Sequence, residues 1–89
     1  MENVNPAKEK IVNLIDLINN EEYSKASYLS NQLLKENKRS YILHNLQGII
    51  SLHISKYDEA IISFLQAIKL NKNFFDPYNR FHLQPKHFF

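Results

Sequence analysis

Apolar residues recur along the chain at intervals of three and four, with polar residues between them. Such spacing places the apolar side chains on one side of an α-helix, where they can pack against a neighbouring element. No stretch shows the strict two-residue alternation that is typical of a half-buried β-strand. The pattern predicts an all-α fold. The apolar positions of the four main helices are Ile11, Leu14, Ile15 and Ile18, then Tyr23, Ala26, Leu29, Leu33 and Leu34, then Ile42, Leu43, Leu46, Ile49, Ile50 and Leu52, and then Tyr57, Ala60, Ile61, Phe64, Ala67 and Ile68.

Capping residues predict where the helices begin. Asn5 is a good N-cap, and Pro6 fits the first turn of a helix, where its missing N–H costs nothing. Ser40 can cap the third helix in the same way. Ser55 and Asp58 have the spacing of a capping box, in which the first side chain caps the helix and the second reaches back to the cap. The fourth helix is therefore expected to start directly after Ser55.

A fifth helix is expected near the C-terminus, and it is short. Asp76 and Pro77 suit its first turn, but Pro85 cannot continue a helix. The segment between these prolines is too short to be stable without packing. Tyr78 and Phe81 would then cover only part of the apolar face of the fourth helix. We expect either self-association through this end of the chain or a marginally stable monomer.

Small and large residues alternate where the third and fourth helices would meet. Gly48, Ala60 and Ala67 leave room for a close approach of two helices. Tyr57 and Phe64 are large enough to fill the space that remains. This alternation is typical of two antiparallel helices joined by a short turn.

The pattern occurs twice along the chain, at a fixed distance. The distance from Tyr23 to Tyr57 equals the distance from Ala26 to Ala60, and we call it the repeat interval. Helical hairpins with a period of about 34 residues, which this interval matches, resemble the tetratricopeptide repeat (TPR) family. The match is clearest in the second half of the chain, which has Leu-Gln-Gly, then Tyr-Asp-Glu-Ala, then Phe, then Ala-Ile. The resemblance implies a short right-handed solenoid of antiparallel helix hairpins with about five helices.

The first of the two repeats departs most from the TPR pattern. Leu14 stands where the family has Gly, and Ser30 stands where it has an aromatic residue. The second repeat has Ser55 in place of the loop Gly. The resemblance divides the chain into an N-terminal flank (1–5), a degenerate TPR-like repeat (6–39), a TPR-like repeat (40–74), the short helix that starts a third repeat (75–84) and a C-terminal tail (85–89).

The TPR resemblance implies that the chain binds a protein or peptide partner and is not an enzyme. The first helix of each hairpin lines the concave face of such a stack. Members that hold a C-terminal carboxylate need Lys, Arg and Asn there, whereas this chain has mainly Ile and Leu. We expect an apolar groove for an extended or helical peptide; the alternative is that part of this stripe is core between the helices. The expected groove residues are Ile11, Ile15, Ile42, Asn45, Ile49, Leu52, His53 and Asn79, and the structural motif residues are Gly48, Tyr57, Ala60, Phe64, Ala67, Tyr23 and Ala26.

Composition narrows the range of functions. The chain has no Cys and a net charge of +2, so it lacks thiolate chemistry and the strongly basic surface of a typical nucleic-acid-binding domain. His44 and His53 fall on opposite sides of one helix and cannot share a metal ion. We expect no cofactor, no metal, no nucleic acid and no membrane contact. No targeting segment is evident, and the default expectation is a cytoplasmic protein.

A second hypothesis concerns the parent protein. The repeat pattern stops early in a third repeat, which favours an N-terminal TPR segment of a larger protein over a complete adaptor. An enzyme domain such as a transferase could follow downstream in that case. Sequencing past the final codon distinguishes the two hypotheses.

Overall fold

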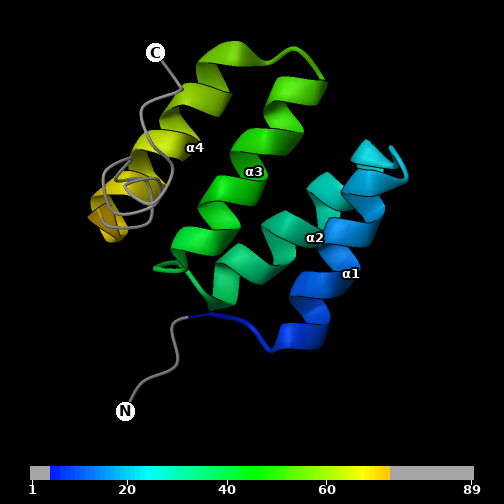
Figure 1. Ribbon diagram of the computed structural model, residues 1–89, viewed down its shortest axis with the longest axis horizontal. Helices are drawn as coiled ribbons and strands as arrows, with labels where there is room; N and C mark the ends of the chain where they lie inside the picture. Colours follow the sequence, from blue (N-terminus) through cyan, green and yellow to red (C-terminus); the bar gives the residue numbers. More distant parts are fainter. Residues whose placement is uncertain (1–4, 73–89) are drawn as a thin grey trace, which may run out of the picture.

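The computed structural model describes residues 5–72, and the regular secondary structure of this part is helical throughout (Figure 1). The all-α class is therefore confirmed for these residues. The expected fifth helix lies outside the described residues, and so does Asn79. The helices are α1 (Lys8–Asn19), α2 (Tyr23–Glu36), α3 (Tyr41–His53) and α4 (Tyr57–Leu70).

The helices form two antiparallel hairpins, α1–α2 and α3–α4, which lie side by side (Figure 1). The most extensive contact is between α3 and α4, and the hairpins are joined mainly by the packing of α2 on α3. α1 also touches α3. Each helix thus packs mostly against its neighbours in the chain, as expected for helices that are connected by short turns.

The main core lies between the first three helices. Leu14 of α1 is completely shielded from solvent, as are Leu43 and Ile50 of α3. They share one cluster with Ala26 and Leu33 of α2, and the small side chain of Ala26 allows a close approach of the helices. Most of the apolar residues predicted for these three helices therefore face inward, but Ile15 and Leu52 are exposed. The buried cluster comprises Leu14, Ile18, Ala26, Leu33, Leu43, Leu46 and Ile50.

α1 and α3 end in the same type of turn, at positions separated by the repeat interval. Glu21 has a φ of 62°, and its N–H donates to the carbonyl of Ile18 at 3.0 Å. The N–H of Glu22 donates to the carbonyl of Leu17 at 2.9 Å. These two bonds define a Schellman motif, which ends a helix with one residue in the left-handed conformation. Ser55 has a φ of 65°, and the corresponding two bonds measure 3.1 and 2.8 Å.

The capping box predicted at the start of α4 is wrong. Lys56 is the N-cap and makes no side-chain capping bond, while the Oγ of Ser55 accepts a hydrogen bond from the Tyr57 hydroxyl at 3.4 Å. The reason is that Ser55 serves to end α3, and its left-handed backbone moves it out of the capping position. The start of α4 is instead supported by Asp58 and Glu59, whose negative charge suits the first turn of a helix.

The predicted start of α1 is also wrong. The helix begins at Lys8, with Ala7 as its N-cap, because Asn5 is used elsewhere. The Oδ1 of Asn5 accepts a hydrogen bond from the Oγ of Ser40 at 2.6 Å. Ser40 in turn accepts a hydrogen bond from the N–H of Leu43 at 3.2 Å, so its predicted role as the N-cap of α3 is confirmed. This buried serine connects the segment before α1 to the start of the second hairpin.

The two hairpins place their large residue on opposite helices. In the second hairpin, the ring of Phe64 in α4 lies over Gly48 in α3. The positions one repeat interval earlier hold Leu14 in α1 and Ser30 in α2, and both are completely buried. The two hairpins therefore differ at both positions together, since a larger residue on the first helix accompanies a smaller residue on the second helix in the first hairpin.

Only one side of α4 is buried. Ala60 and Ala67 are completely shielded from solvent, as predicted. The prediction that Tyr57, Ile61 and Ile68 are also buried is wrong, since they are exposed. Because successive helical residues are turned by about 100°, this second apolar stripe lies to the side of the alanines and remains largely open to solvent.

Candidate protein-interaction surfaces

The apolar groove predicted on α1 and α3 contains side chains of two kinds. Ile11, Ile42 and Ile49 are partly buried and pack against the core cluster. Ile15 and Leu52 are 37% and 46% exposed, so they can contact another molecule. The predicted stripe therefore serves both as core and as surface. Of the remaining members, Asn45 is partly buried, His53 is exposed, and Asn79 lies outside the described residues.

Polar and aromatic pairs hold the two hairpins together. His53 at the end of α3 stacks on Tyr23 at the start of α2, with ring centroids 4.9 Å apart and an angle of 11° between the rings. The Oγ of Ser30 donates to the Oε1 of Gln47, and the Nε2 of Gln47 donates to the Oδ1 of Asn31 at 3.4 Å. The spacing of apolar residues did not identify Gln47 as a residue that links the two hairpins. The sequence does hold one indication of this role. Gln47 is a polar residue on the side of α3 that carries the core residues Leu43 and Ile50.

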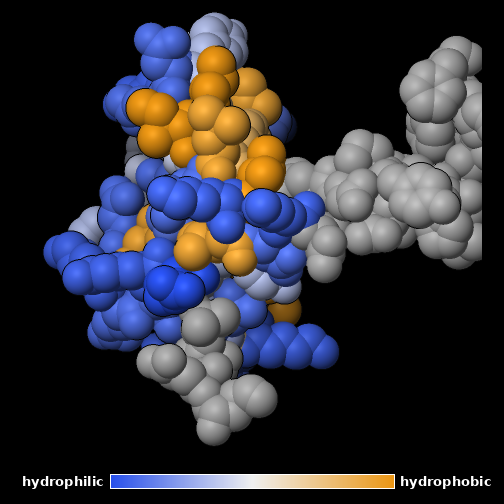
Figure 2. Space-filling model, turned by 90° about the vertical axis from the view of Figure 1, so that its left-hand side faces the viewer, coloured by the Kyte–Doolittle hydropathy of each residue, from blue (hydrophilic) through white to orange (hydrophobic). Residues whose placement is uncertain are grey.

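A stripe of large apolar residues on α4 remains accessible to solvent. We name it the α4 outer face and define it as Tyr57, Ile61, Leu65 and Ile68, which are 58%, 56%, 59% and 36% exposed. Figure 2 shows the molecule from the α4 side, where a group of apolar side chains lies at the surface and hydrophilic side chains separate it from a second, smaller group. Exposed apolar residues are common when they are scattered, but a contiguous stripe marks a site of interaction.

The α4 outer face corresponds to the side of α2 that receives α3. The positions one repeat interval before it are Tyr23, Ser27, Asn31 and Leu34. Tyr23 stacks on an α3 side chain, Asn31 bonds to another, and Leu34 packs against the core cluster. The α4 outer face therefore corresponds to the side of α2 against which α3 packs. It is more apolar than that side of α2, because Ile61 and Leu65 replace Ser27 and Asn31.

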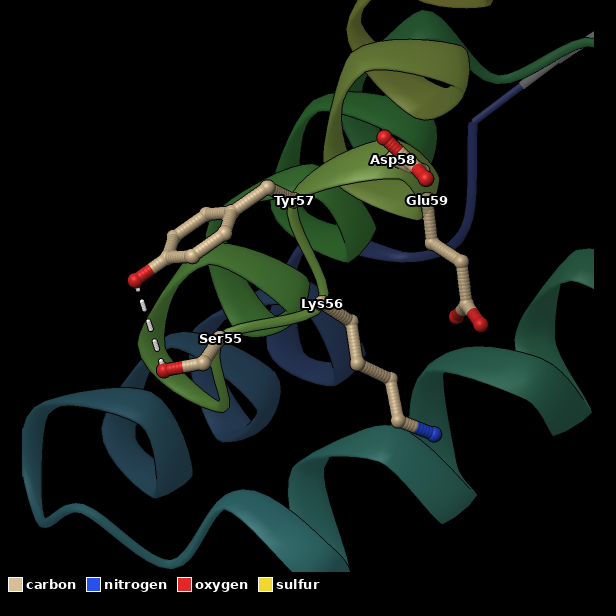
Figure 3. A pocket seen from close by; sticks show the side chains of 5 residues that line it. All are labelled: Ser55, Lys56, Tyr57, Asp58 and Glu59. Carbon is tan, nitrogen blue, oxygen red and sulfur yellow. Dashed lines mark hydrogen bonds between the residues drawn. The ribbon is translucent and has the colours of Figure 1, made fainter.

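A hollow of about 340 Å³ lies at the turn between α3 and α4, and Figure 3 shows the five residues that line it. The side chain of Tyr57 points away from those of Lys56 and Glu59, and the carboxylates of Asp58 and Glu59 diverge. The Tyr57 hydroxyl donates a hydrogen bond to the Oγ of Ser55 at 3.4 Å. General acid–base catalysis needs groups that converge on one reacting atom, and these side chains do not converge.

Neither a metal-binding cluster nor a membrane-spanning helix occurs in the described part of the chain. Within residues 5–72, no three His, Cys, Asp or Glu side chains gather in a way that could hold a metal ion. None of the four helices combines the length and the apolar character that crossing a bilayer requires. The ring of His44 is engaged locally, with its Nε2 at 2.9 Å from the carbonyl oxygen of Lys38.

No family model, no curated protein and no solved structure matches this chain. The two hairpins of the chain are, however, similar to each other. Three of the four helix boundaries of the first hairpin, and its left-handed turn, recur in the second hairpin after one repeat interval.

Proposed function

We propose that this chain is a protein-interaction module of the TPR type, a short right-handed solenoid of helical hairpins that holds a peptide segment of a partner protein and catalyses no reaction. The observation that carries this proposal is the repetition of one hairpin with its turn. Glu21 and Ser55, which are one repeat interval apart, adopt the same left-handed conformation and make the same pair of backbone hydrogen bonds. Stacked hairpins of this kind offer extended surfaces for binding.

The peptide would lie along α1 and α3, the first helices of the two hairpins, which touch each other. Ile15 and Leu52 are exposed there, and Ile49, the counterpart of Ile15 in the second repeat, is partly exposed. Asn45 adds an amide that can both donate to and accept from a peptide backbone. This combination favours a peptide with spaced apolar side chains over one that is recognised through a carboxylate.

The proposal can be tested by selecting peptides from a random library displayed on phage against the full chain. We expect the selected peptides to carry apolar residues at regular spacing. Their affinity should fall by at least about tenfold in Leu52→Asp and Ile49→Asp, because a charge in the contact loses about 1.4 kcal/mol or more. Leu65→Asp on α4 is the matched control, since it places the same charge on an exposed Leu of the other surface.

Circular dichroism must show that each variant keeps its helical content. If Leu52→Asp and Ile49→Asp remain folded and bind every selected peptide as the wild type does, the assignment of the binding site to α1 and α3 is wrong. If no peptide with apolar spacing can be selected at all, the proposed function itself is wrong.

A further inference from the structure

We propose that the α4 outer face is a self-recognition surface, through which two copies of this chain pair with their α4 helices antiparallel. Its four residues are spaced by four, four and three positions, which keeps their side chains in one stripe along the helix. The stripe runs along most of α4, from its first residue, Tyr57, to Ile68. This surface is separate from the groove on α1 and α3, and the proposal does not depend on that groove.

The first hairpin shows which kind of element fits this side of a hairpin. There, Tyr23 of α2 stacks on His53 of α3, and Asn31 of α2 accepts a hydrogen bond from Gln47 of α3, so the bound element is a helix. On α4 the counterparts of Ser27 and Asn31 are Ile61 and Leu65. The occupant of the α4 outer face should therefore be a helix whose contacting side is apolar throughout.

The segment that follows α4 in the chain offers such a side only in part in the repeat register, where Phe81 is the counterpart of Gln47, the α3 residue that bonds to Asn31. Leu43, Leu46 and Ile50 are the residues by which α3 enters the core cluster that it shares with α2. A following helix that docked on α4 in the same register would need apolar side chains one repeat interval after these three. Those positions hold Pro77, Arg80 and Gln84.

A second α4 helix does offer a matching side, and charge determines its direction. Asp58 lies in the first turn of α4 and Lys69 in the last turn. They are eleven residues apart, which is three turns plus about 20°, so both lie on the same flank of the apolar stripe. In an antiparallel pair, Asp58 of each copy meets Lys69 of the other, and the helix dipoles are also opposed. In a parallel pair, the flank with Asp58 and Lys69 would lie on one side of the contact in one copy and on the other side in the second copy. Asp58 of one copy would then not meet Lys69 of the other.

Sedimentation velocity of the full chain from low micromolar to millimolar concentration tests the proposal. We expect a reversible dimer in the wild type, because the contact is small and therefore weak. Ile61→Asp and Leu65→Asp should raise the dissociation constant by at least about thirtyfold, as for central residues of an interface. Tyr28→Asp is the control, since Tyr28 is 69% exposed on α2 and does not belong to the α4 outer face or its charged flank. It should dimerise as the wild type does.

A charge exchange tests the antiparallel direction. Asp58→Lys alone and Lys69→Asp alone each create two repulsive pairs in a homodimer, so each variant should dimerise about tenfold more weakly than the wild type. An equimolar mixture of the two variants restores opposite charges at both ends of a mixed dimer. We expect the mixture to regain the wild-type dissociation constant.

Three results would overturn the proposal. The first is a wild-type protein that is monomeric at every concentration, together with a lower melting temperature of the Ile61→Asp variant. Residues 73–89 of the same chain would then cover the α4 outer face. The second is a dimer that is insensitive to Ile61→Asp and Leu65→Asp. The third is a monomer that binds an apolar helix of another protein at this face, which would assign the surface to a different partner.

Discussion

The ring of Phe64 lies so close to Gly48 that a Cβ at residue 48 would come within 2.5 Å of the ring atom Cε1. Replacing Gly by Ala inside a helix normally stabilises the helix by about 1 kcal/mol. Here the ring has to move outward and lose its contact with α3, so Gly48→Ala should lower the free energy of unfolding by about 1–3 kcal/mol. Urea denaturation measures this change.

A double-mutant cycle shows whether the ring is the cause. In a Phe64→Ala background, Gly48→Ala has nothing to displace and should be neutral or slightly stabilising. If Gly48→Ala costs the same in both backgrounds, the contact between these two residues does not limit the approach of α3 and α4.

Leu43→Ala should be more damaging than Phe64→Ala. Leu43 is completely buried among three helices, so its truncation should cost about 2–5 kcal/mol in the free energy of unfolding. Phe64 is only partly buried and should cost less than the roughly 3–5 kcal/mol that is usual for a buried Phe. Val12→Ala at an exposed site is the control and should change stability little. The reverse order for Leu43 and Phe64 would place the core between α3 and α4 instead.

Glycine at either left-handed turn should stabilise the fold. A side chain in this conformation costs about 1–2 kcal/mol, and the greater freedom of an unfolded Gly returns only part of that. Glu21→Gly and Ser55→Gly should therefore each raise the free energy of unfolding by about 0.5–1 kcal/mol. Asn20→Gly is the control, because Asn20 has a φ of −89° and gains nothing from Gly. Thermal melting of the three variants distinguishes these outcomes, and a loss at both positive-φ sites would contradict the turn geometry.

Ser40→Ala should lower the free energy of unfolding by about 1–2 kcal/mol. The substitution removes the cap of α3 and also the hydroxyl that donates to Asn5. Ser24→Ala on the exposed side of α2 provides the comparison and should be nearly neutral. Hydrogen exchange should be faster at the start of α3 in Ser40→Ala, and unchanged exchange at Leu43 would show that the serine does not cap this helix.

The spacing of apolar residues predicts the helices and their core sides because both follow from the same helical period. The helix ends are harder to predict, since one residue can serve either of two helices. Ser55 has the spacing of a cap for α4, yet it is needed as the left-handed residue that ends α3. Asn5 likewise bonds to Ser40, which is distant in the chain, and this tertiary contact outweighs its local preference as a cap.

The candidate surfaces are harder still to predict, because periodicity shows which residues share a side but not what covers that side. Ile61 and Ile68 belong to the helical pattern as regularly as Ala60 and Ala67, yet only the alanines of these four residues are buried. On α3, Ile49 and Leu52 likewise read as one stripe, but Ile49 packs against the core while Leu52 remains exposed. Burial depends on the angle between neighbouring helices, which the pattern does not contain.

The opposite placement of the large residue in the two hairpins means that the hairpins are not interchangeable parts. A chain assembled from two copies of the second hairpin would put Phe at the position of Ser30, where the hydroxyl now bonds to Gln47. A chain assembled from two copies of the first would put Leu at position 48 and Ser at position 64. Recombination of these hairpins can give a folded chain only if the first helix and the second helix of a hairpin are exchanged together. The residue at position 47 must also be able to pack against the residue at position 30 of the hairpin placed before it.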